Sequence, residues 1–415
     1  MNVTMLLFKD VLYDARVQRE ALSLAEEGHL VEILCLKEYE ENLPKLHDHL
    51  SIKRFSISTK AVKQKLAGQS KSATNRSHSV KSILFKVVQQ PVVKLIKDLW
   101  AYDQFYKQCD QYLTEKKDQV DVIHCHDLNT LSAGVKLSRK YNMYLIYDSH
   151  ELFNEMAGRN EVDRKYGYWL EKKLMKEIDH LIVVNPYVEQ EFKKMYGDHI
   201  KATIIQNTPI NTLQTKRSMV VKNLREFYRI ENNEIFLIYQ GGLSPFRGIE
   251  LIINSLTYLP DKFKLVIMGT GRLLTNLIAL VEELKLTDRV FFHPQVKASE
   301  VLHYTKQADI GLVMYENTSK NNYFSTPNKI FEYLLAGIPT VASKHPGKQY
   351  VVEVEKTGIC TEENPVSIAK AIQDVIENYD TYVSNCKAKQ YVYTWEYEKQ
   401  KLQALYNEIK QNVKQ

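Results

Sequence analysis

The stretch 322–343, NYFSTPNKIFEYLLAGIPTVAS, carries the start, the apolar face and the end of a short helix. Pro327 suits the first position of a helix, and Gly337 with Pro339 ends one, so the stretch predicts a helix over residues 327–336. Two preceding side chains can cap its first amides: Ser325 and Thr326. Four apolar residues share one helical face and predict packing against a core: Ile330, Phe331, Leu334 and Leu335.

The amino-terminal end of this predicted helix has the properties of an anion site. Free amides and the positive end of the helix dipole are expected beside Thr326, Pro327 and Asn328, and Lys329 adds a full positive charge. Glu332 follows within two turns, where its carboxylate can accept hydrogen bonds from ribose hydroxyls. This combination favours a nucleoside diphosphate. The alternative is an ordinary surface helix on which Glu332 is solvated.

Length and composition favour a two-domain enzyme. A chain of 415 residues is expected to form about two domains of roughly 200 residues. No run approaches the roughly 18 consecutive apolar residues of a membrane span, and the first residues, MNVTMLLFKD, lack the basic region and the cleavage site of a secretory signal. The five cysteines are widely spaced and odd in number, so we expect reduced packing residues and a cytoplasmic protein.

Strand and helix patterns alternate from the first residues onward. Residues 3–8 predict a strand, 15–27 a helix and 29–36 a second strand, which is the unit that builds parallel sheets. The predicted helix starts at the carboxyl edge of the sheet, where such sheets bind ligands. Arg16 is therefore a candidate contact for a phosphate or an acceptor. The alternative for Arg16 is a surface ion pair.

Histidines accompany two further predicted strands. Residues 121–125 predict a strand, on which His124 and His126 share one face at the spacing of a metal pair. No third ligand is evident, so no metal site is predicted, and His126 is assigned to the acceptor side. Residues 144–148 predict the next strand, and His150 directly after it is placed to touch substrate. The alternative is a packed or capping histidine.

A glycine-containing loop follows the strand predicted over residues 234–240. Gly241 and Gly242 allow a close approach of the backbone, and Arg247 can hold a phosphate with two hydrogen bonds. Two more glycines follow the next predicted strand, a weaker signal for a nucleotide-side loop: Gly269 and Gly271.

The helix stretch resembles the nucleotide-binding motif of glycosyltransferase family 4, whose members are retaining sugar transferases of the GT-B fold. Two glutamates of that motif flank seven residues just before a Gly-x-Pro, and its second half is matched by Glu332, Gly337 and Pro339. The first glutamate, which contacts hydroxyls of the transferred sugar in the family, is absent here. Phe324 stands in its place, eight residues before Glu332.

Other parts of the family pattern fall on residues named above. In the family, two cations of the loop 241–248 bind the donor diphosphate; Arg247 matches the second, and Gly242 stands where the first is usual. The resemblance also places His150 beside the donor sugar and Val296 where backbone groups meet the base. It implies an acceptor-side domain, a donor-binding domain and a last helix that crosses back to the first domain, with these bounds: 1–207, 208–390 and 391–415.

Positive charge is concentrated in the segment 53–100. The segment holds eleven Lys or Arg and one acid, Asp98, whereas the whole chain has a net charge of +6. Apolar residues in its second half alternate with four lysines, which predicts basic amphipathic helices interrupted near Pro91: Lys81, Lys86, Lys94 and Lys97. Such a surface suits an anionic membrane; the alternative is that the apolar stripe packs on the domain. Nucleic acid is not expected, because aromatic interleaving and recognition motifs are missing.

These observations predict an α/β protein with two Rossmann-like, doubly wound parallel-sheet domains facing each other across a cleft. The resemblance implies retaining transfer from a nucleotide sugar, expected to be a UDP-sugar, to a glycan or lipid-linked acceptor in cell-surface polysaccharide synthesis. No metal or cofactor is expected, because Arg247, Lys329 and the helix amides would neutralise the leaving diphosphate. The alternatives are a non-catalytic, transferase-like partner subunit and a sugar-nucleotide epimerase of similar fold.

Overall fold

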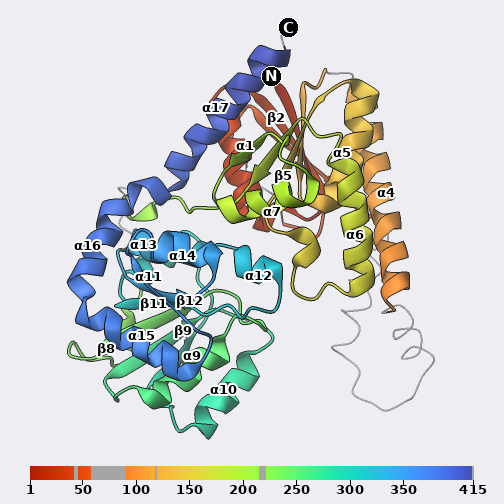
Figure 1. Ribbon diagram of the computed structural model, residues 1–415. Helices are drawn as coiled ribbons and strands as arrows, with labels where there is room; N and C mark the ends of the chain where they lie inside the picture. Colours follow the sequence, from red (N-terminus) through yellow and green to blue (C-terminus); the bar gives the residue numbers. More distant parts are fainter. Residues whose placement is uncertain (42–44, 58–89, 117–118, 215–220, 414–415) are drawn as a thin grey trace. The chain divides into compact units, whose positions relative to one another are not determined.

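The computed structural model describes residues 1–41, 45–57, 90–116, 119–214 and 221–413. The chain divides into two compact units (Figure 1). The first comprises residues 1–205 with 399–415, and the second comprises residues 206–398. Each unit is built on a parallel sheet with helices on both faces, which confirms the predicted fold class.

The first unit contains a parallel sheet with seven described strands in the order β3-β2-β1-β4-β5-β6-β7. Each strand is short, and most positions in the central strands are buried, as is usual when helices cover both faces. The bounds are β1 Asn2–Leu7, β2 Leu30–Leu36, β3 Leu50–Phe55, β4 Val122–His126, β5 Tyr144–Ser149, β6 His180–Val183 and β7 Ala202–Ile204.

Helices cover the two faces of this first sheet. α4, α5 and α6 pack beside one another on one face, while α1 and the end of α17 lie over the other (Figure 1). The bounds are α1 Ala15–Glu26, α4 Pro91–Lys116, α5 Leu128–Tyr141, α6 Glu161–Leu174, α7 Pro186–Tyr196 and α17 Trp395–Val413.

The second unit contains a parallel sheet whose six described strands follow the order β10-β9-β8-β11-β12-β13. Its strands are β8 Ile235–Gln240, β9 Phe263–Met268, β10 Val290–His293, β11 Ile310–Val313, β12 Thr340–Ser343 and β13 Gly358–Thr361. Its helices are α8 Leu224–Phe227, α9 Ile249–Ser255, α10 Leu274–Glu283, α11 Val301–Thr305, α12 Lys320–Phe324, α13 Asn328–Ala336, α14 Pro346–Val352, α15 Pro365–Glu377 and α16 Tyr379–Lys389.

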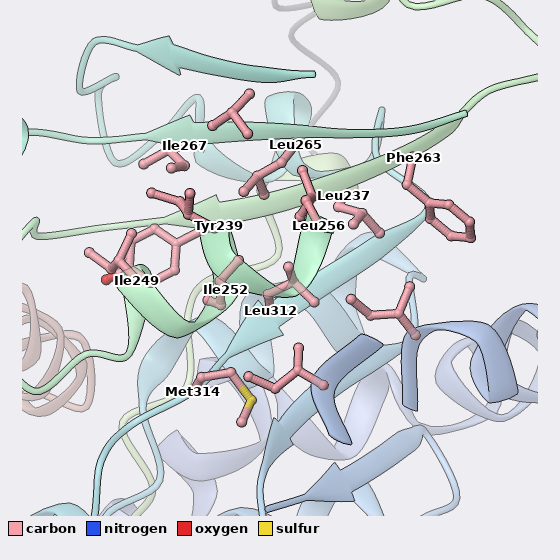
Figure 2. Close-up of a cluster of buried hydrophobic side chains, with 14 of the residues drawn as sticks. Leu237, Tyr239, Ile249, Ile252, Leu256, Phe263, Leu265, Ile267, Leu312 and Met314 are labelled. Atoms are coloured by element: carbon pink, nitrogen blue, oxygen red, sulfur yellow. The ribbon is translucent and has the colours of Figure 1, made fainter. Parts of the chain in front are cut away.

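Figure 2 shows the hydrophobic cluster between α9 and one face of the second sheet. Ile249 and Ile252 of α9 pack towards Leu237 and Leu265 of the strands, and all four side chains are fully buried. Fully burying an aliphatic side chain of this size contributes about 1.5–3 kcal/mol. This cluster fixes α9, and with it the loop that precedes α9, against the carboxyl edge of the sheet.

Most of the elements predicted from sequence lie within two residues of their observed bounds. The predicted helix 327–336 is α13, and Gly337 ends it with a φ of 79°, in the left-handed region that glycine favours. The five cysteines are free and buried, as predicted. The segment 58–89, with Lys81 and Lys86, lies outside the described residues. α4 begins at Pro91 and continues as one helix to Lys116.

The strand orders fix where ligands can bind in each unit. In an open parallel sheet, ligands bind beyond the carboxyl ends of two neighbouring strands whose connections run to opposite sides. That point lies between β1 and β4 in the first unit and between β8 and β11 in the second. The loops after these four strands are therefore the places to search for function.

Candidate functional site

In the second unit, two glycine loops meet at the carboxyl edge of the sheet. A Cβ atom on Gly269 would lie 1.9 Å from the Gly241 carbonyl oxygen, and one on Gly271 would lie 2.2 Å from the Leu243 carbonyl oxygen. Both positions therefore require glycine. Gly242 differs, because nothing lies within 4 Å of its Cβ position, and both Gly241 and Gly242 are exposed.

Two cations lie beside these loops. The Lys329 ammonium is 3.9 Å from the centre of the Tyr239 ring and 5.6 Å from that of Tyr315, and the Arg247 guanidinium is 4.1 Å from the Tyr315 ring. Lys329 Nζ also lies 3.5 Å from the Cβ position of Gly241. Burial and the neighbouring Arg247 charge lower the pKa of Lys329 to about 7, although Glu332 opposes the shift. An anion at this place would stabilise the charged form of both side chains.

The cap residue of α13, Pro327, makes no side-chain hydrogen bond to the first amides of the helix. The predicted capping by Ser325 or Thr326 is therefore wrong. The Thr326 hydroxyl instead donates to the Gly347 carbonyl at 2.6 Å, and the Ser325 hydroxyl donates to the Asn322 carbonyl at 3.4 Å. Thr326 thus ties the start of α13 to α14.

Glu332 is held in one orientation by a chain of hydrogen bonds. Gln240, at the end of β8, donates from Nε2 to Glu332 Oε2 at 2.5 Å. The other end of the same amide accepts a hydrogen bond from the Thr305 hydroxyl at 2.6 Å, which fixes the direction of the amide. Glu332 is half-buried, and its carboxylate is a hydrogen-bond acceptor.

The remaining residues predicted on the donor side fall near the same edge of the sheet. Asn328, the first residue of α13, is exposed, and Val296 follows β10 and packs against the core on one face of the sheet. Phe324 ends α12, where its half-buried ring packs edge-on against Tyr323 at 5.0 Å between centroids.

In the first unit, Arg16 lies in a buried ion-pair network instead of on the surface. Its guanidinium donates to both oxygens of Asp148, from Nη2 to Oδ1 at 3.0 Å and from Nε to Oδ2 at 3.2 Å. Nε also lies 2.9 Å from Glu20 Oε1, one turn further along α1. All three side chains are at most 2% exposed. The surface ion pair considered for Arg16 is therefore wrong, and its contact with an acceptor stays a prediction.

His124 and His126 face the same network from β4. Their rings stack with centroids 4.4 Å apart, and His124 Nδ1 lies 2.9 Å from the Tyr406 hydroxyl of α17. Both histidines are fully buried. Burial and the neighbouring His124 lower the pKa of His126 to about 3, so His126 is neutral at physiological pH.

A third and a fourth potential metal ligand are present here, contrary to the sequence prediction. Glu20 and Asp148 bring carboxylate oxygens within 4.8 Å of ring nitrogens of His124 and His126. Arg16 already supplies the positive charge that these carboxylates need, and it does so with hydrogen bonds to both Asp148 oxygens. We therefore describe the group as an ion-pair network and assign no metal to it.

His150 lies at the edge of this network, directly after β5. Its Nε2 is 3.3 Å from Asp148 Oδ2 and 3.1 Å from His126 Nδ1, and its Nδ1 is 3.7 Å from Asp127 Oδ2. Its side chain is 12% exposed, so it reaches the surface where Arg16 and His126 do not. Burial opposes the charged form, but Asp127 and Asp148 outweigh it and raise the pKa of His150 to about 9.

Asp127 has an unusual backbone that points its side chain at His150. Its φ of 62° and ψ of 163° lie in a region essentially reserved for glycine, which costs about 1–3 kcal/mol. Asp127 stands at the cap position of α5 but makes no capping hydrogen bond; its Oδ1 accepts the backbone N–H of His150 at 3.2 Å. The Asp14 carboxylate is paired with Lys9 at 2.6 Å, and the same pair interacts electrostatically with His150 and Asp127.

The structure thus brings the predicted residues together in two groups, one in each unit. Arg247, Lys329, Glu332 and the glycine loops share the carboxyl edge of the second sheet, while His150 shares that of the first with Asp127. Sequence reasoning missed Asp127, Asp148 and Gln240 as supporting residues. The signal that could have found them is position, because each directly follows or ends a predicted strand.

Comparison with known proteins gives the class. A family model described as "Glycosyltransferase Family 4" matches residues 15–208, and one described as "Glycosyl transferases group 1" matches residues 220–391. An uncharacterized glycosyltransferase of Methanocaldococcus jannaschii is 25% identical over 291 residues, covering 67% of this chain and 73% of that protein.

Two solved structures share the fold over nearly the whole chain. Sucrose-phosphate synthase from Thermosynechococcus elongatus superposes with a TM-score of 0.75 at 18% identity, covering 99% of each chain. HepE of Anabaena, solved in complex with UDP, superposes with a TM-score of 0.72 at 15% identity, covering 98% of this chain and all of that one. The fold is that of the GT-B class, and both family models describe glycosyltransferases. More particularly, the chain belongs to the group 1 glycosyltransferases, in glycosyltransferase family 4.

Proposed function

We propose that this glycosyltransferase moves a sugar from a UDP-sugar to a glycan or lipid-linked acceptor, with retention of configuration and without a metal ion. The observation that carries the proposal is the pair of cations, Lys329 and Arg247, gathered on the Tyr239 and Tyr315 rings beside exposed Gly241 and Gly242. A leaving UDP gathers negative charge on its diphosphate, and fixed cations placed there in advance stabilise that charge.

The rest of the second unit supports the same ligand. The start of α13 offers amides without a side-chain cap, which suits a phosphate, and Glu332 is oriented by Gln240 as an acceptor for ribose hydroxyls. The similarity to HepE in complex with UDP favours UDP among the nucleotides. The backbone groups around Val296 are proposed to meet the base.

In the first unit, His150 is proposed as the residue beside the transferred sugar. It directly follows β5 and lies beside Asp127 of the loop after β4, at the carboxyl edge of the sheet, and it is partly exposed, as a substrate contact requires. Its raised pKa of about 9 makes it a charged hydrogen-bond donor at neutral pH, not a base. Such a donor can stabilise charge that develops on the sugar and phosphate oxygens during transfer.

The acceptor is proposed to lie at a membrane surface on the cytoplasmic side, in cell-surface polysaccharide synthesis. α4 exposes apolar side chains in its first three turns, including Ile96 at 62% and Trp100 at 53%. This exposure favours a surface contact over the alternative that the apolar side chains of this helix pack on the domain. Trp169 of α6, the neighbouring helix, is 59% exposed. Aromatic and basic side chains together suit the headgroup region of an anionic bilayer. In the described part of the chain, no helix is long and apolar enough to cross a membrane.

The proposal is tested by incubating the protein with a panel of nucleotide sugars and membrane extract in the presence of a chelator. We expect UDP release from one donor, and a product whose anomeric proton has the donor's configuration by NMR. Release that requires added divalent metal would contradict metal independence. Release of a different nucleoside diphosphate would correct the donor, and inversion at the anomeric carbon would overturn retention.

A non-catalytic partner subunit remains the second candidate, because Phe324 and Gly242 replace two side chains of the family pattern. The two candidates differ in a single measurement. Both a partner subunit and an enzyme would bind UDP in a thermal-shift assay. Only the enzyme would also release UDP from a donor when membrane extract is present.

A further inference from the structure

We propose that Asp148 is a positioning residue for His150: its Oδ2 holds the Nε2 edge of the imidazole ring and leaves the Nδ1 edge beside Asp127 for a substrate oxygen. The inference rests on the proposed function, in which His150 contacts the sugar. It assigns a role to a carboxylate that is fully buried and therefore cannot touch substrate itself.

Asp148 Oδ2 is the centre of a fixed array of nitrogen atoms. Arg16 Nε and Nη2 approach it at 3.2 and 3.1 Å, His126 Nδ1 at 3.4 Å and His150 Nε2 at 3.3 Å. An oxygen that receives donors from three sides cannot move without breaking several of these contacts. Any nitrogen proton directed at it is held in the same place.

The contacts of the two ring nitrogens of His150 differ in kind. Nε2 has two buried partners within 3.3 Å, Asp148 and His126, whereas Nδ1 lies 3.7 Å from its nearest carboxylate, that of Asp127. A separation of 3.7 Å is beyond a hydrogen bond, so Nδ1 is available to a further partner. Asp127 is 15% exposed, so this partner can come from solvent or from a substrate.

The sheet explains why the two residues act together. Asp148 and His150 are separated by one residue at the end of β5, which places both side chains on the same face. His126 pairs with Asp148 across the ladder between β4 and β5, and Arg16 reaches Asp148 from α1. The anchor is therefore built from three elements of the fold, while the anchored ring extends just beyond the edge of the sheet.

Several titratable or charged groups surround His150 and would set its pH dependence. From β5 there is Asp148, from α1 and its cap there are Asp14, Arg16 and Glu20, and from β4 and its loop there are His124, His126 and Asp127. Lys9 and Glu151 lie further out, where Lys9 pairs with Asp14 and interacts with Glu151. The carboxylates outnumber the permanent cations in this set. Removing the Asp148 charge should therefore lower the pKa of His150.

The first test is a titration of the wild-type protein, which needs no activity. In ¹⁵N-labelled protein we expect the His150 ring nitrogens, assigned by comparison with His150→Gln, to remain protonated above pH 8. In Asp148→Asn the proton should be lost at a lower pH. A wild-type His150 that titrates near pH 6.5, or a titration unchanged in Asp148→Asn, would overturn the positioning role.

The second test is a double-mutant cycle on the turnover of the natural reaction. We expect Asp148→Asn to lower kcat about tenfold or more with little change in the KM for donor, and to have no further effect in a His150→Gln background. Equal losses in both backgrounds would mean that Asp148 is only structural. His180→Gln serves as a matched control, because His180 is another buried histidine of the same sheet, bonded to Thr203 at 2.8 Å.

The two proposals fail in different ways. If wild type releases no nucleotide from any donor, the proposed function fails, but the titration still decides whether Asp148 holds His150. If Asp148→Asn does not fold, the wild-type titration and the charge-retaining variant Asp148→Glu take its place. Asp148→Glu would keep the raised pKa but displace the ring, so we expect loss of turnover without loss of the high-pH titration.

Discussion

The ammonium of Lys329 lies 3.9 Å from the centre of the Tyr239 ring, with its charge directed at an aromatic face instead of at a carboxylate. A cation over an aromatic ring is weakly stabilised, by about 0.5–2 kcal/mol. An anionic ligand at this place would therefore form a stronger interaction with Lys329 than the ring does. The lowered pKa of Lys329 fits that arrangement. A diphosphate would be such a ligand.

We predict that UDP binds more weakly as pH rises above 7. Lys329 has a pKa of about 7 in the free protein, and a bound diphosphate would raise that pKa, so binding above pH 7 requires uptake of a proton. The affinity for UDP should fall by up to about tenfold per pH unit from pH 7 upward. Below pH 7 Lys329 is already charged, so its titration should no longer change the affinity. Calorimetry in buffers of different ionisation enthalpy measures both the affinity and the proton uptake. Lys329→Arg is the control, because arginine stays charged, and an equal slope in that variant would refute the assignment.

We predict that Arg247→Ala lowers UDP affinity by roughly tenfold or more, because a charge-assisted hydrogen bond contributes about 1.5–3 kcal/mol. The affinity for uridine, which lacks the phosphates, should not change. Isothermal titration with UDP and uridine separates the two effects. A similar loss for both ligands would show that Arg247 supports the fold of the loop and does not contact the diphosphate.

We predict that Gly242→Arg strengthens UDP binding. The Cβ position of Gly242 meets no atom within 4 Å, and its φ is not among the positive ones, so the larger side chain fits without strain. A third cation beside the diphosphate should raise the affinity several-fold at low salt, and the gain should shrink at high salt. Gly241→Arg is the matched control: with a φ of 116° and Lys329 close by, it should lose stability and affinity.

We predict that Glu332→Gln weakens binding of UDP more than binding of inorganic diphosphate, since only UDP has a ribose. The substitution leaves one carbonyl oxygen, which can accept from Gln240 Nε2 in only one orientation of the new amide, so the thermal stability of each variant must be measured alongside. Gln240→Glu is an informative partner variant, because it would place two acidic side chains together and turn the Glu332 carboxyl away. Equal losses for both ligands in Glu332→Gln would mean that Glu332 does not hold the ribose.

We predict that the protein sediments with anionic vesicles, and that Trp100→Ser with Trp169→Ser reduces the bound fraction. Both side chains are more than half exposed on the neighbouring helices α4 and α6, so their loss should cost little stability. Tyr258→Ser in the second unit is the matched control, with 57% exposure. If wild type remains in the supernatant at low salt, the acceptor is not reached through this surface.

The sequence was sufficient to predict the parts that local signals control. The helix stop at Gly337 and the strand that ends at Gln240 follow from glycine conformation and from strand periodicity, which act over a few residues. The close backbone contact at Gly269 was not predicted, because that glycine was identified only as part of a nucleotide-side loop. Arg247, Lys329 and Glu332 were also named from local signals, whereas the Tyr239 and Tyr315 rings beside the two cations were not predicted. Cap chemistry was predicted less well, since Thr326 found a carbonyl of α14 that is 21 residues away.

The buried network in the first unit could not be predicted in the same way. Arg16 meets Asp148 across 132 residues, and neither residue lies in a motif that names the other. A charged residue at the start of a helix usually faces water, and burying one is tolerated only if its partners are all in place. The packing of β4, β5 and α1 decides which side chains meet in this network. Hydrophobic periodicity within each element does not predict which side chains of different elements meet.

The contact between Tyr406 and His124 spans 282 residues and the entire second unit. During synthesis on a ribosome, β1 to β7 emerge long before the segment of α17 that supplies this hydroxyl. Until then His124 lacks the hydroxyl group that pairs with its Nδ1, and α17 does not yet cover this part of the sheet. The first unit therefore matures only after α17 has been synthesised, so the whole second unit must be made before the surroundings of His150 are complete.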